Sequence, residues 1–263
     1  MKLSISNIAW DAQDNEIVYA WMKDYGFTGL EIAPTKIFPV SPYDRLEEAR
    51  QWSQTLYDTY GFVVPSMQSI WFGRQEKLFG TPEERSALLE YTKKAIRFAA
   101  AIGCKNLVFG CPKNRQKPES ASEETALEFF YAIGEYAKEH GTTIGMEANP
   151  PMYQTNYIND TAAALTLIQQ VNSKGFLLNL DVGTMIVNGE SADLLTGMVS
   201  YINHVHISEP GLQSIQPREL HSNILVRLRE ENYDRYISVE MGGTTEREMI
   251  RGVLSYVNGI FSS

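Results

Sequence analysis

The feature that most constrains this chain is a regular alternation of short β-rich runs with amphipathic helical stretches along its whole length. Apolar residues follow a strand-like pattern in each run and recur at helical spacing in the stretch after it. The eight strand-like runs are LSISNIAW, TGLEIAP, FVVPSMQSIW, NLVFGCP, TIGMEANP, FLLNLDVG, INHVHISEP and YISVEM. The eight helical stretches cover residues 15–24, 42–60, 82–102, 122–140, 160–172, 191–201, 217–232 and 245–261. Strands that alternate with helices in this way predict an α/β fold with a parallel sheet.

Eight such units are the number that closes a barrel. A (β/α)8 TIM barrel takes roughly 250 residues, and the chain has 263. An open doubly wound sheet would also alternate, but no G-x-G-x-x-G motif follows the first run, so a dinucleotide-binding fold gains no support. No shift in composition and no low-complexity linker divides the chain. We therefore expect a single TIM-barrel domain over residues 1–263.

Four of the runs carry a side chain suited to metal binding at or near the end of the strand. Glu147 ends the apolar part of the fifth run, Asp181 lies in the sixth, His206 in the seventh and Glu240 in the eighth. Burying an ionised carboxylate costs several kcal/mol unless it is paired or bound to a cation. Residues at one end of the strands of a parallel barrel point towards a common centre, so we expect these four to share one ion. Each of them alone could instead cap a strand or pair with an arginine.

Two long loops follow the third and seventh runs, and loops after barrel strands lie on the catalytic face. The sequence places aromatic, polar and charged residues at the start of both loops and just after Glu147. The candidates for substrate contact are Gln68, Trp71, Arg74, Tyr153 and Glu209. We expect the segment 71–80 to cover the substrate, although its aromatic residues could equally serve only to anchor the loop.

Charge and hydropathy exclude several classes of function. The net charge of −9 disfavours a nucleic-acid partner, because phosphates require a basic surface. With 43% hydrophobic and 21% charged residues, the chain has no uninterrupted apolar run near the ~20 residues of a membrane span. The N-terminus becomes polar and acidic before it could form the core of a signal peptide, so we expect a cytoplasmic protein without a membrane partner.

Five short motifs give the chain a family resemblance. G-L-E-I, M-E-A-N-P, L-D-V-G, H-V-H-I-S-E and S-V-E-M occur in this order in the second, fifth, sixth, seventh and eighth runs. In these motifs the chain resembles the xylose isomerase-like TIM-barrel superfamily, whose members include ketose 3-epimerases, inosose dehydratases and endonuclease IV enzymes. The resemblance implies one divalent metal ion, held by Glu147, Asp181, His206 and Glu240. Three carboxylates and one imidazole suit Mn²⁺, Mg²⁺ or Co²⁺ better than a structural zinc ion.

The resemblance also implies a reaction. In the epimerases that the chain resembles, the carboxylates corresponding to Glu147 and Glu240 transfer the proton, which makes these two the expected catalytic residues. The expected enzyme is a metal-dependent isomerase or epimerase of carbohydrate metabolism that removes a proton from a sugar or sugar phosphate to form an enediolate. A metal-dependent dehydratase (lyase) acting on a keto-polyol or a shikimate-type substrate is the alternative. A non-catalytic carbohydrate-binding barrel is a third, and the resemblance also allows a homo-oligomer.

One position departs from the pattern of the epimerases. They carry a histidine three residues after the aspartate, and here that position is Thr184, so the sugar contact made by that imidazole is lost or replaced. The chain has four histidines, whereas the three-metal cluster of the endonuclease IV enzymes uses several more, which weighs against that activity. We expect His204 to be a structural residue deeper in the barrel and His221 to be a surface or capping residue.

Overall fold

The computed structural model describes residues 1–262 and confirms the predicted (β/α)8 TIM barrel. Its eight parallel strands are β1 (Lys2–Ser6), β2 (Gly29–Glu31), β3 (Ser66–Met67), β4 (Asn106–Phe109), β5 (Ile144–Met146), β6 (Phe176–Asp181), β7 (Ile202–Ser208) and β8 (Tyr236–Glu240). They follow the order β2-β1-β8-β7-β6-β5-β4-β3. Two isolated parallel bridges, Gly29–Val63 and Ile32–Met67, join β2 to β3, so the barrel is nearly closed.

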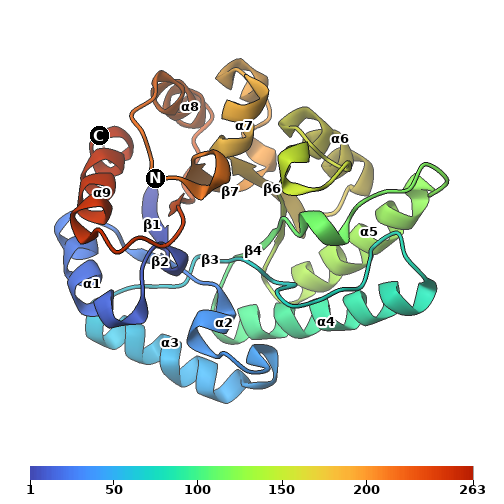
Figure 1. Ribbon diagram of the computed structural model, residues 1–263, viewed down its shortest axis with the longest axis horizontal. Helices are drawn as coiled ribbons and strands as arrows, with labels where there is room; N and C mark the ends of the chain where they lie inside the picture. The colour runs from blue at the N-terminus through green and yellow to red at the C-terminus, as the bar shows by residue number, and fades with distance from the viewer. Residues whose placement is uncertain (263) are drawn as a thin grey trace.

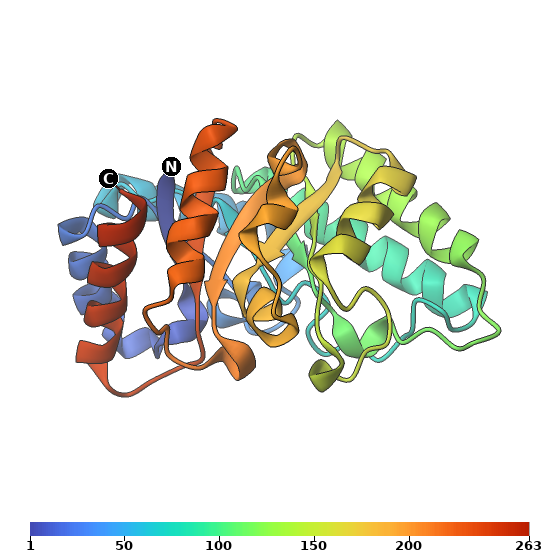
Figure 2. The ribbon, with the colours of Figure 1, turned by 90° about the horizontal axis from the view of Figure 1, so that it is seen from above.

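The helices form a ring around the strands (Figure 1). They are α1 (Asn15–Asp24), α2 (Pro34–Ile37), α3 (Leu46–Tyr60), α4 (Pro82–Ala101), α5 (Glu123–Glu139), α6 (Thr161–Val171), α7 (Val182–Asn188), α8 (Glu219–Glu230) and α9 (Arg247–Phe261). Figure 2 shows α8 and α9 side by side next to the strands. Among residues 1–262, none of the helices combines the length and the apolar composition of a membrane span.

The structure corrects the predicted helix at 191–201. The helix of the sixth unit is α7, which starts directly after β6, and residues 191–201 hold only the short 3-10 turns Ala192–Leu195 and Val199–Tyr201. Asp181 is the N-cap of α7, because its carboxylate accepts a hydrogen bond from the backbone N–H of Thr184 at 2.7 Å. Gly189 ends the helix in the left-handed region at φ 64°. The prediction failed because Asp181 was interpreted only as a strand-end ligand and not also as a cap.

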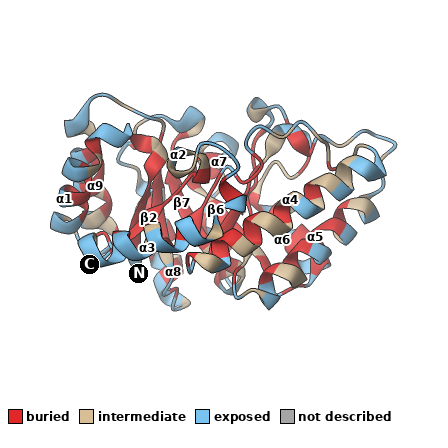
Figure 3. Cartoon of the chain, turned by 90° about the horizontal axis from the view of Figure 1, so that it is seen from below, coloured by how far each residue is buried: buried red, intermediate tan, exposed pale blue. Residues whose placement is uncertain are grey.

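Apolar side chains fill the layer between the strands and the helices. Figure 3 shows buried residues along the strands and on the inner faces of the helices, with exposed residues outside. The lumen of the barrel is different, because polar side chains occupy it where branched apolar residues are usual. The polar residues of the strands that are at most 2% exposed are Ser4, Ser6, Glu31, Ser66, Asn106, Asn179, His204, His206, Ser208 and Ser238.

Hydrogen bonds between strands that are not neighbours establish that these side chains meet across the lumen. Asn106 on β4 donates from Nδ2 to Oδ1 of Asn179 on β6 at 3.2 Å, above the intervening strand β5. Gly145 of β5 makes this possible, since a Cβ at that position would lie 2.5 Å from Oδ1 of Asn106. The glycine in the run TIGMEANP therefore leaves room for an amide network that leads towards Glu147.

Candidate metal centre and active site

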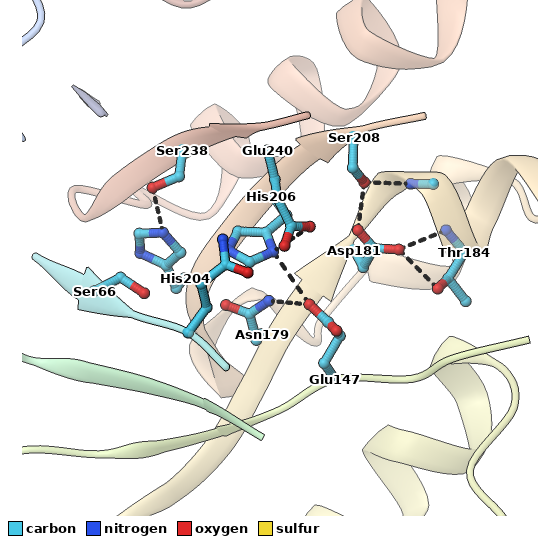
Figure 4. A network of polar contacts seen from close by, with 12 residues as sticks. Ser66, Glu147, Asn179, Asp181, Thr184, His204, His206, Ser208, Ser238 and Glu240 are labelled. Carbon is cyan, nitrogen blue, oxygen red and sulfur yellow. Dashed lines mark hydrogen bonds and ion pairs between the residues drawn. The ribbon is translucent and has the colours of Figure 1, made fainter. Parts of the chain in front are cut away.

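Four side chains converge at the C-terminal ends of strands β5 to β8 (Figure 4). Glu147 follows β5 directly, Asp181 ends β6, His206 lies in β7 and Glu240 ends β8. Each offers one ligand atom, and these atoms all lie within 4.8 Å of one another. His206 is fully buried, Glu147 and Glu240 are nearly so, and Asp181 is half-buried. The structure thus brings together the four residues that the strand ends suggested, while their role as metal ligands stays a prediction.

His206 is the centre of the group. Its Nδ1 lies 3.1 Å from Oε1 of Glu147 and 3.1 Å from Oε2 of Glu240. Its Nε2 lies 2.9 Å from Oε2 of Glu31, which comes from β2 on the other side of the lumen. Burial alone would lower the pKa of His206, but the carboxylates of Glu31 and Glu240 raise it well above its usual value. The imidazole is therefore enclosed by negative charge on both of its nitrogen atoms.

The sequence analysis did not identify Glu31 as a residue of the site, although its place in an apolar run could have indicated it. A carboxylate inside the apolar run TGLEIAP needs a buried partner, and the side chain is indeed fully buried. Burial alone would raise the pKa of Glu31, but His206 and His204 hold it well below its usual value. The sequence gives no indication of which residue faces β2 across the barrel, so the partner could not be named.

Asp181 is held on both oxygens by neighbouring hydroxyl groups. Oδ1 accepts a hydrogen bond from Ser208, and Oδ2 lies 2.8 Å from the hydroxyl of Thr184. The same hydroxyl lies 2.8 Å from the carbonyl oxygen of Ala148, and Thr184 is 1% exposed. Burial and the charge of Glu147 raise the pKa of Asp181 to about 6. The threonine that departs from the epimerase pattern therefore orients the aspartate and does not face solvent.

The two glutamates have unequal surroundings. Oε1 of Glu147 accepts a hydrogen bond from Nδ2 of Asn179 at 2.9 Å, and Oε2 accepts one from Nδ2 of Asn149 at 3.0 Å. In residues 1–262, the carboxylate of Glu240 has His206 as its only polar contact. Burial raises the pKa of Glu240 to about 7, with His206 opposing the shift and the neighbouring acids adding to it. Glu147 is thus fixed by two amides, whereas Glu240 is held by the imidazole alone.

A glycine at the end of β4 leaves room for the Glu147 carboxylate. The backbone N–H of Glu147 donates to the carbonyl oxygen of Phe109 at 3.1 Å, which fixes the residue beside Gly110. A Cβ at Gly110 would lie 2.8 Å from Oε2 of Glu147. Only glycine at position 110 permits this approach without a shift of the carboxylate.

A cavity of about 150 Å³ opens over the three carboxylates. The other residues that line it are Pro112, Asn149, Tyr153, Ser208, Glu209 and Leu212. Tyr153 accepts a hydrogen bond at its hydroxyl from the N–H of Gly211 at 2.8 Å. A larger cavity of about 530 Å³ lies at the opposite end of the barrel, but it contains no group of carboxylates. The clustered carboxylates therefore lie at the C-terminal mouth, which is the end where TIM-barrel enzymes carry their active sites.

Of the five candidates for substrate contact, Tyr153 and Glu209 line the cavity over the carboxylates. Glu209 forms an ion pair there with Arg218, whose Nε lies 2.7 Å from Oε1 of the glutamate. The structure does not bring the other three to this cavity. Gln68 lies deeper, where its Nε2 donates to Ser6 at 2.7 Å and to Glu31 at 3.1 Å.

Trp71 and Arg74 belong to the wall of the barrel and to a separate surface cavity. Trp71 is 3% exposed, donates from Nε1 to the hydroxyl of Thr92 at 2.8 Å and packs edge-on against Phe109. Arg74 pairs with Glu76 and lies 4.8 Å over the ring of Tyr91. The tryptophan thus anchors the segment 71–80, and neither side chain lines the cavity over the carboxylates.

The two remaining histidines of the sequence analysis are both buried. His204 lies two residues before His206 on β7, and its Nε2 is 2.7 Å from the hydroxyl of Ser238. Its position deeper in the lumen agrees with the structural role that we expected. His221 is fully buried against Tyr256, with its Nδ1 2.9 Å from the tyrosine hydroxyl, so its predicted surface position was wrong. The face of α8 that points towards α9 could not be identified before the start of that helix was known.

The residues at the C-terminal mouth fit a divalent cation. Three carboxylates with ligand atoms so close together repel one another, and a single imidazolium compensates for only part of their charge. Oxygen donors with one imidazole nitrogen suit Mn²⁺, Mg²⁺ or Co²⁺. A cation would supply the missing charge, and Glu31 behind His206 resembles the carboxylate that commonly orients a metal-bound histidine.

Comparisons with known proteins agree with this fold. A family model described as xylose isomerase-like TIM barrel matches residues 19–255. No curated protein sequence gives a match. The D-psicose 3-epimerase of Clostridium cellulolyticum is 15% identical, with 99% of each chain covered and a TM-score of 0.77. The 3-keto-D-glucoside 4-epimerase of E. coli is 20% identical, with 98% of this chain and 99% of the other covered and a TM-score of 0.78.

A structure with a different name shares the fold as well. The family 2 AP endonuclease of Brucella melitensis is 17% identical, with 97% of this chain and 98% of the other covered and a TM-score of 0.73. At such low identities these structures establish the fold that the chains share. They do not decide between the reactions that their names describe.

Proposed function

The chain belongs to the xylose isomerase-like TIM barrel family, and from its acidic centre we propose that it is a divalent-metal-dependent isomerase or epimerase of a sugar or sugar phosphate. One observation carries this proposal. Two carboxylates, Glu147 and Glu240, lie 3.1 Å from the same nitrogen of His206 and line one cavity. Reactions that remove a proton beside a carbonyl and return it elsewhere need two positioned carboxylates of this kind.

In the proposed enzyme, Glu147, Asp181, His206 and Glu240 hold Mn²⁺, Mg²⁺ or Co²⁺. When bound, the cation would polarise a substrate carbonyl and make the neighbouring C–H more acidic. Ser208 and Thr184 hold the carboxylate of Asp181, and Glu31 holds the imidazole of His206. These neighbours restrict the rotation of the ligands, which favours a single arrangement of the centre.

The proton transfer itself falls to the two glutamates. One carboxylate oxygen takes the proton from the substrate carbon, while the electron pair of the C–H bond moves towards the carbonyl oxygen and gives an enediolate. In an epimerisation the other glutamate returns a proton to the opposite face of the same carbon. In an aldose–ketose isomerisation the proton goes to the neighbouring carbon, and the hydroxyl proton moves from the oxygen that becomes the new carbonyl to the oxygen of the old one. Both carboxylates are nearly fully buried and line the same cavity, so a substrate carbon bound there would contact both of them.

The names of the similar structures support a carbohydrate substrate. Two of them are a D-psicose 3-epimerase and a 3-keto-D-glucoside 4-epimerase, and both names describe inversion at a carbon of a sugar. A nucleic-acid substrate, as the name of the AP endonuclease would suggest, fits less well. The cavity of about 150 Å³ is lined by carboxylates and the net charge is −9, so phosphates along a strand would be repelled.

The proposal can be tested by proton exchange. The protein is loaded with Mn²⁺ and incubated in D₂O with a panel of ketoses, aldoses and their phosphates. We expect NMR to show loss of one C–H signal beside the carbonyl of at least one sugar, together with the appearance of an isomer or epimer. An absorbance band of an enone product without an isomer would indicate the dehydratase instead. Absence of both exchange and product for every sugar, at full metal loading, would contradict the proposal.

A further inference from the structure

Arg115 is fully buried and has no carboxylate partner within residues 1–262. Its Nη1 donates to the backbone carbonyl oxygen of Glu147 at 2.8 Å. Its Nη2 donates to Oδ1 of Asn149 at 2.9 Å and to the carbonyl oxygen of Ile158 at 3.3 Å, and its Nε has no partner. Arginine is almost never fully buried without an acidic partner, because the loss of hydration is costly. A cation in this place therefore needs a reason beyond packing.

The contacts of Arg115 fix the orientation of the Asn149 side chain. Oδ1 of Asn149 faces the guanidinium, so its Nδ2 must point the other way, towards Oε2 of Glu147 at 3.0 Å. A rotated amide would place its N–H groups against the guanidinium and its oxygen against the carboxylate. Both contacts would then be repulsive, so the arginine excludes the rotated form.

The backbone of Asn149 is also fixed. Its N–H donates to the carbonyl oxygen of Ile158 at 3.1 Å, and its own carbonyl oxygen accepts from Nδ2 of Asn159 at 2.8 Å. The loop after β5 therefore cannot move away from Glu147 without breaking several hydrogen bonds. Asn149 also lines the cavity over the carboxylates, next to the oxygen that it holds.

We propose that Arg115 and Asn149 are positioning residues that hold one oxygen of Glu147 in place for proton transfer. The proposal rests on the proposed function, in which Glu147 is one of two proton-transferring carboxylates. No amide contacts the carboxylate of Glu240 in the same way, so Arg115 and Asn149 position only one of the two glutamates. The two faces of the substrate would then meet a fixed carboxylate on one side and a more mobile one on the other.

The first test needs no sugar. Mn²⁺ is titrated into wild type, Asn149→Ala and the control Asn114→Ala, whose amide is also buried in a loop but donates to the carbonyl oxygens of Arg74 and Glu76. We expect the Mn²⁺ dissociation constant to rise about 10-fold or more in Asn149→Ala and to stay within about twofold in the control. An unchanged constant in Asn149→Ala would overturn the proposal.

The second test uses Asn149→Asp. The aspartate still offers an oxygen to Arg115, but it places a second oxygen against Glu147 where the N–H donor of the asparagine lies. For a pair of epimers, we expect proton exchange in D₂O to fall about 10-fold or more from one epimer and to stay within about twofold from the other. A merely structural defect would lower both rates equally. Equal changes of the two rates at full metal loading, or no change in either, would overturn the proposal.

The experiments distinguish a failure of the proposed function from a failure of the positioning role. If wild type binds Mn²⁺ but exchanges no sugar proton, the proposed function fails and the Mn²⁺ comparison still decides on the positioning role. If wild type binds no Mn²⁺, crystal structures of wild type and Asn149→Ala decide. We expect the carboxylate of Glu147 to change its orientation in the variant, and an unchanged carboxylate would overturn the proposal.

Discussion

Nε2 of His206 lies 2.9 Å from Oε2 of Glu31, and the two residues come from β7 and β2 on opposite sides of the barrel lumen. Because of this contact, the two nitrogen atoms of the imidazole have different partners. With Nε2–H donating to Glu31, Nδ1 faces Glu147 and Glu240, where it would bind a metal ion after losing its own proton. The contact therefore links a fully buried carboxylate of the second strand to the chemistry at the ends of the fifth and eighth.

Replacing Glu31 by Gln should weaken metal binding without removing a ligand. Glutamine has the same shape, but it no longer holds the Nε2–H form of His206 by charge, so the ring loses basicity and a fixed orientation. Outer partners of this kind typically contribute about 10–100-fold to metal affinity or activity. Titration with Mn²⁺ measures the effect, and the exposed Glu48→Gln, which removes only the ion pair with Arg45, is the control. Equal affinities of Glu31→Gln and Glu48→Gln would contradict this role.

Two glycines offer a matched pair of substitutions. Gly110→Ala places a Cβ 2.8 Å from Oε2 of Glu147, so the carboxylate must shift, whereas a Cβ at Gly252 of α9 has nothing within 4 Å. Misplacement of a reacting group by 1 Å can cost about 10²-fold in rate. We expect turnover to fall by about that factor in Gly110→Ala while its circular dichroism spectrum stays the same.

Gly252→Ala should behave in the opposite way. Replacing a glycine inside a helix by alanine stabilises the fold by roughly 0.5–1 kcal/mol, because the unfolded chain loses conformational freedom. Thermal unfolding should show a slightly higher midpoint, with turnover unchanged. Similar turnover in both glycine variants would mean that the approach of Gly110 to Glu147 has no importance for the reaction.

The strand ends could be predicted from the sequence. The pairs of side chains that contact each other across the lumen could not. Glu147, Asp181 and Glu240 could be found because each follows an apolar run of visible length, and parallel strands end at one mouth of a barrel. Glu31 and Asn179 lie inside such runs, and their partners depend on the stagger of strands far apart in the chain. That stagger follows from the closure of the whole barrel and not from a local pattern.

The directions of the loop side chains could not be predicted from the sequence either. Trp71 and Arg74 lie on the expected rim in sequence, yet Trp71 packs into the wall and Arg74 pairs with Glu76. Arg115, which reaches Glu147 and Asn149 from the loop after β4, has no local pattern that would distinguish it from a surface arginine. The direction of a loop side chain follows from tertiary packing, because loops lack the regular period of strands and helices.

Metal affinity should depend on pH in the range where the ligands take up protons. In the metal-free protein the pKa of Asp181 is raised to about 6 and that of Glu240 to about 7. A cation binds only the deprotonated ligands, so its affinity should fall as the pH drops through about 7 and 6, and the raised pKa of His206 should extend the dependence to higher pH. The loss should approach about tenfold per pH unit for each ligand that is protonated. Mn²⁺ titrations between about pH 8 and 5 measure this slope, and a constant affinity over the whole range would contradict the assignment of these two ligands.

Substitution of the two glutamates separates catalysis from binding. Gln in place of Glu147 or Glu240 keeps the shape and one coordinating oxygen but cannot accept the proton. General-base catalysis typically contributes about 10²–10⁴-fold, so each single variant should lose at least 10²-fold in turnover while it still binds substrate.

For an epimerase, exchange in D₂O should also become one-sided, since each glutamate serves one face of the sugar. Loss of Glu147 should block exchange from one epimer, and loss of Glu240 from the other. A Glu147→Gln, Glu240→Gln double variant with near-normal turnover would rule out the two-carboxylate mechanism, because the other two carboxylates that line the cavity are engaged elsewhere, Glu209 by Arg218 and Asp181 by Ser208.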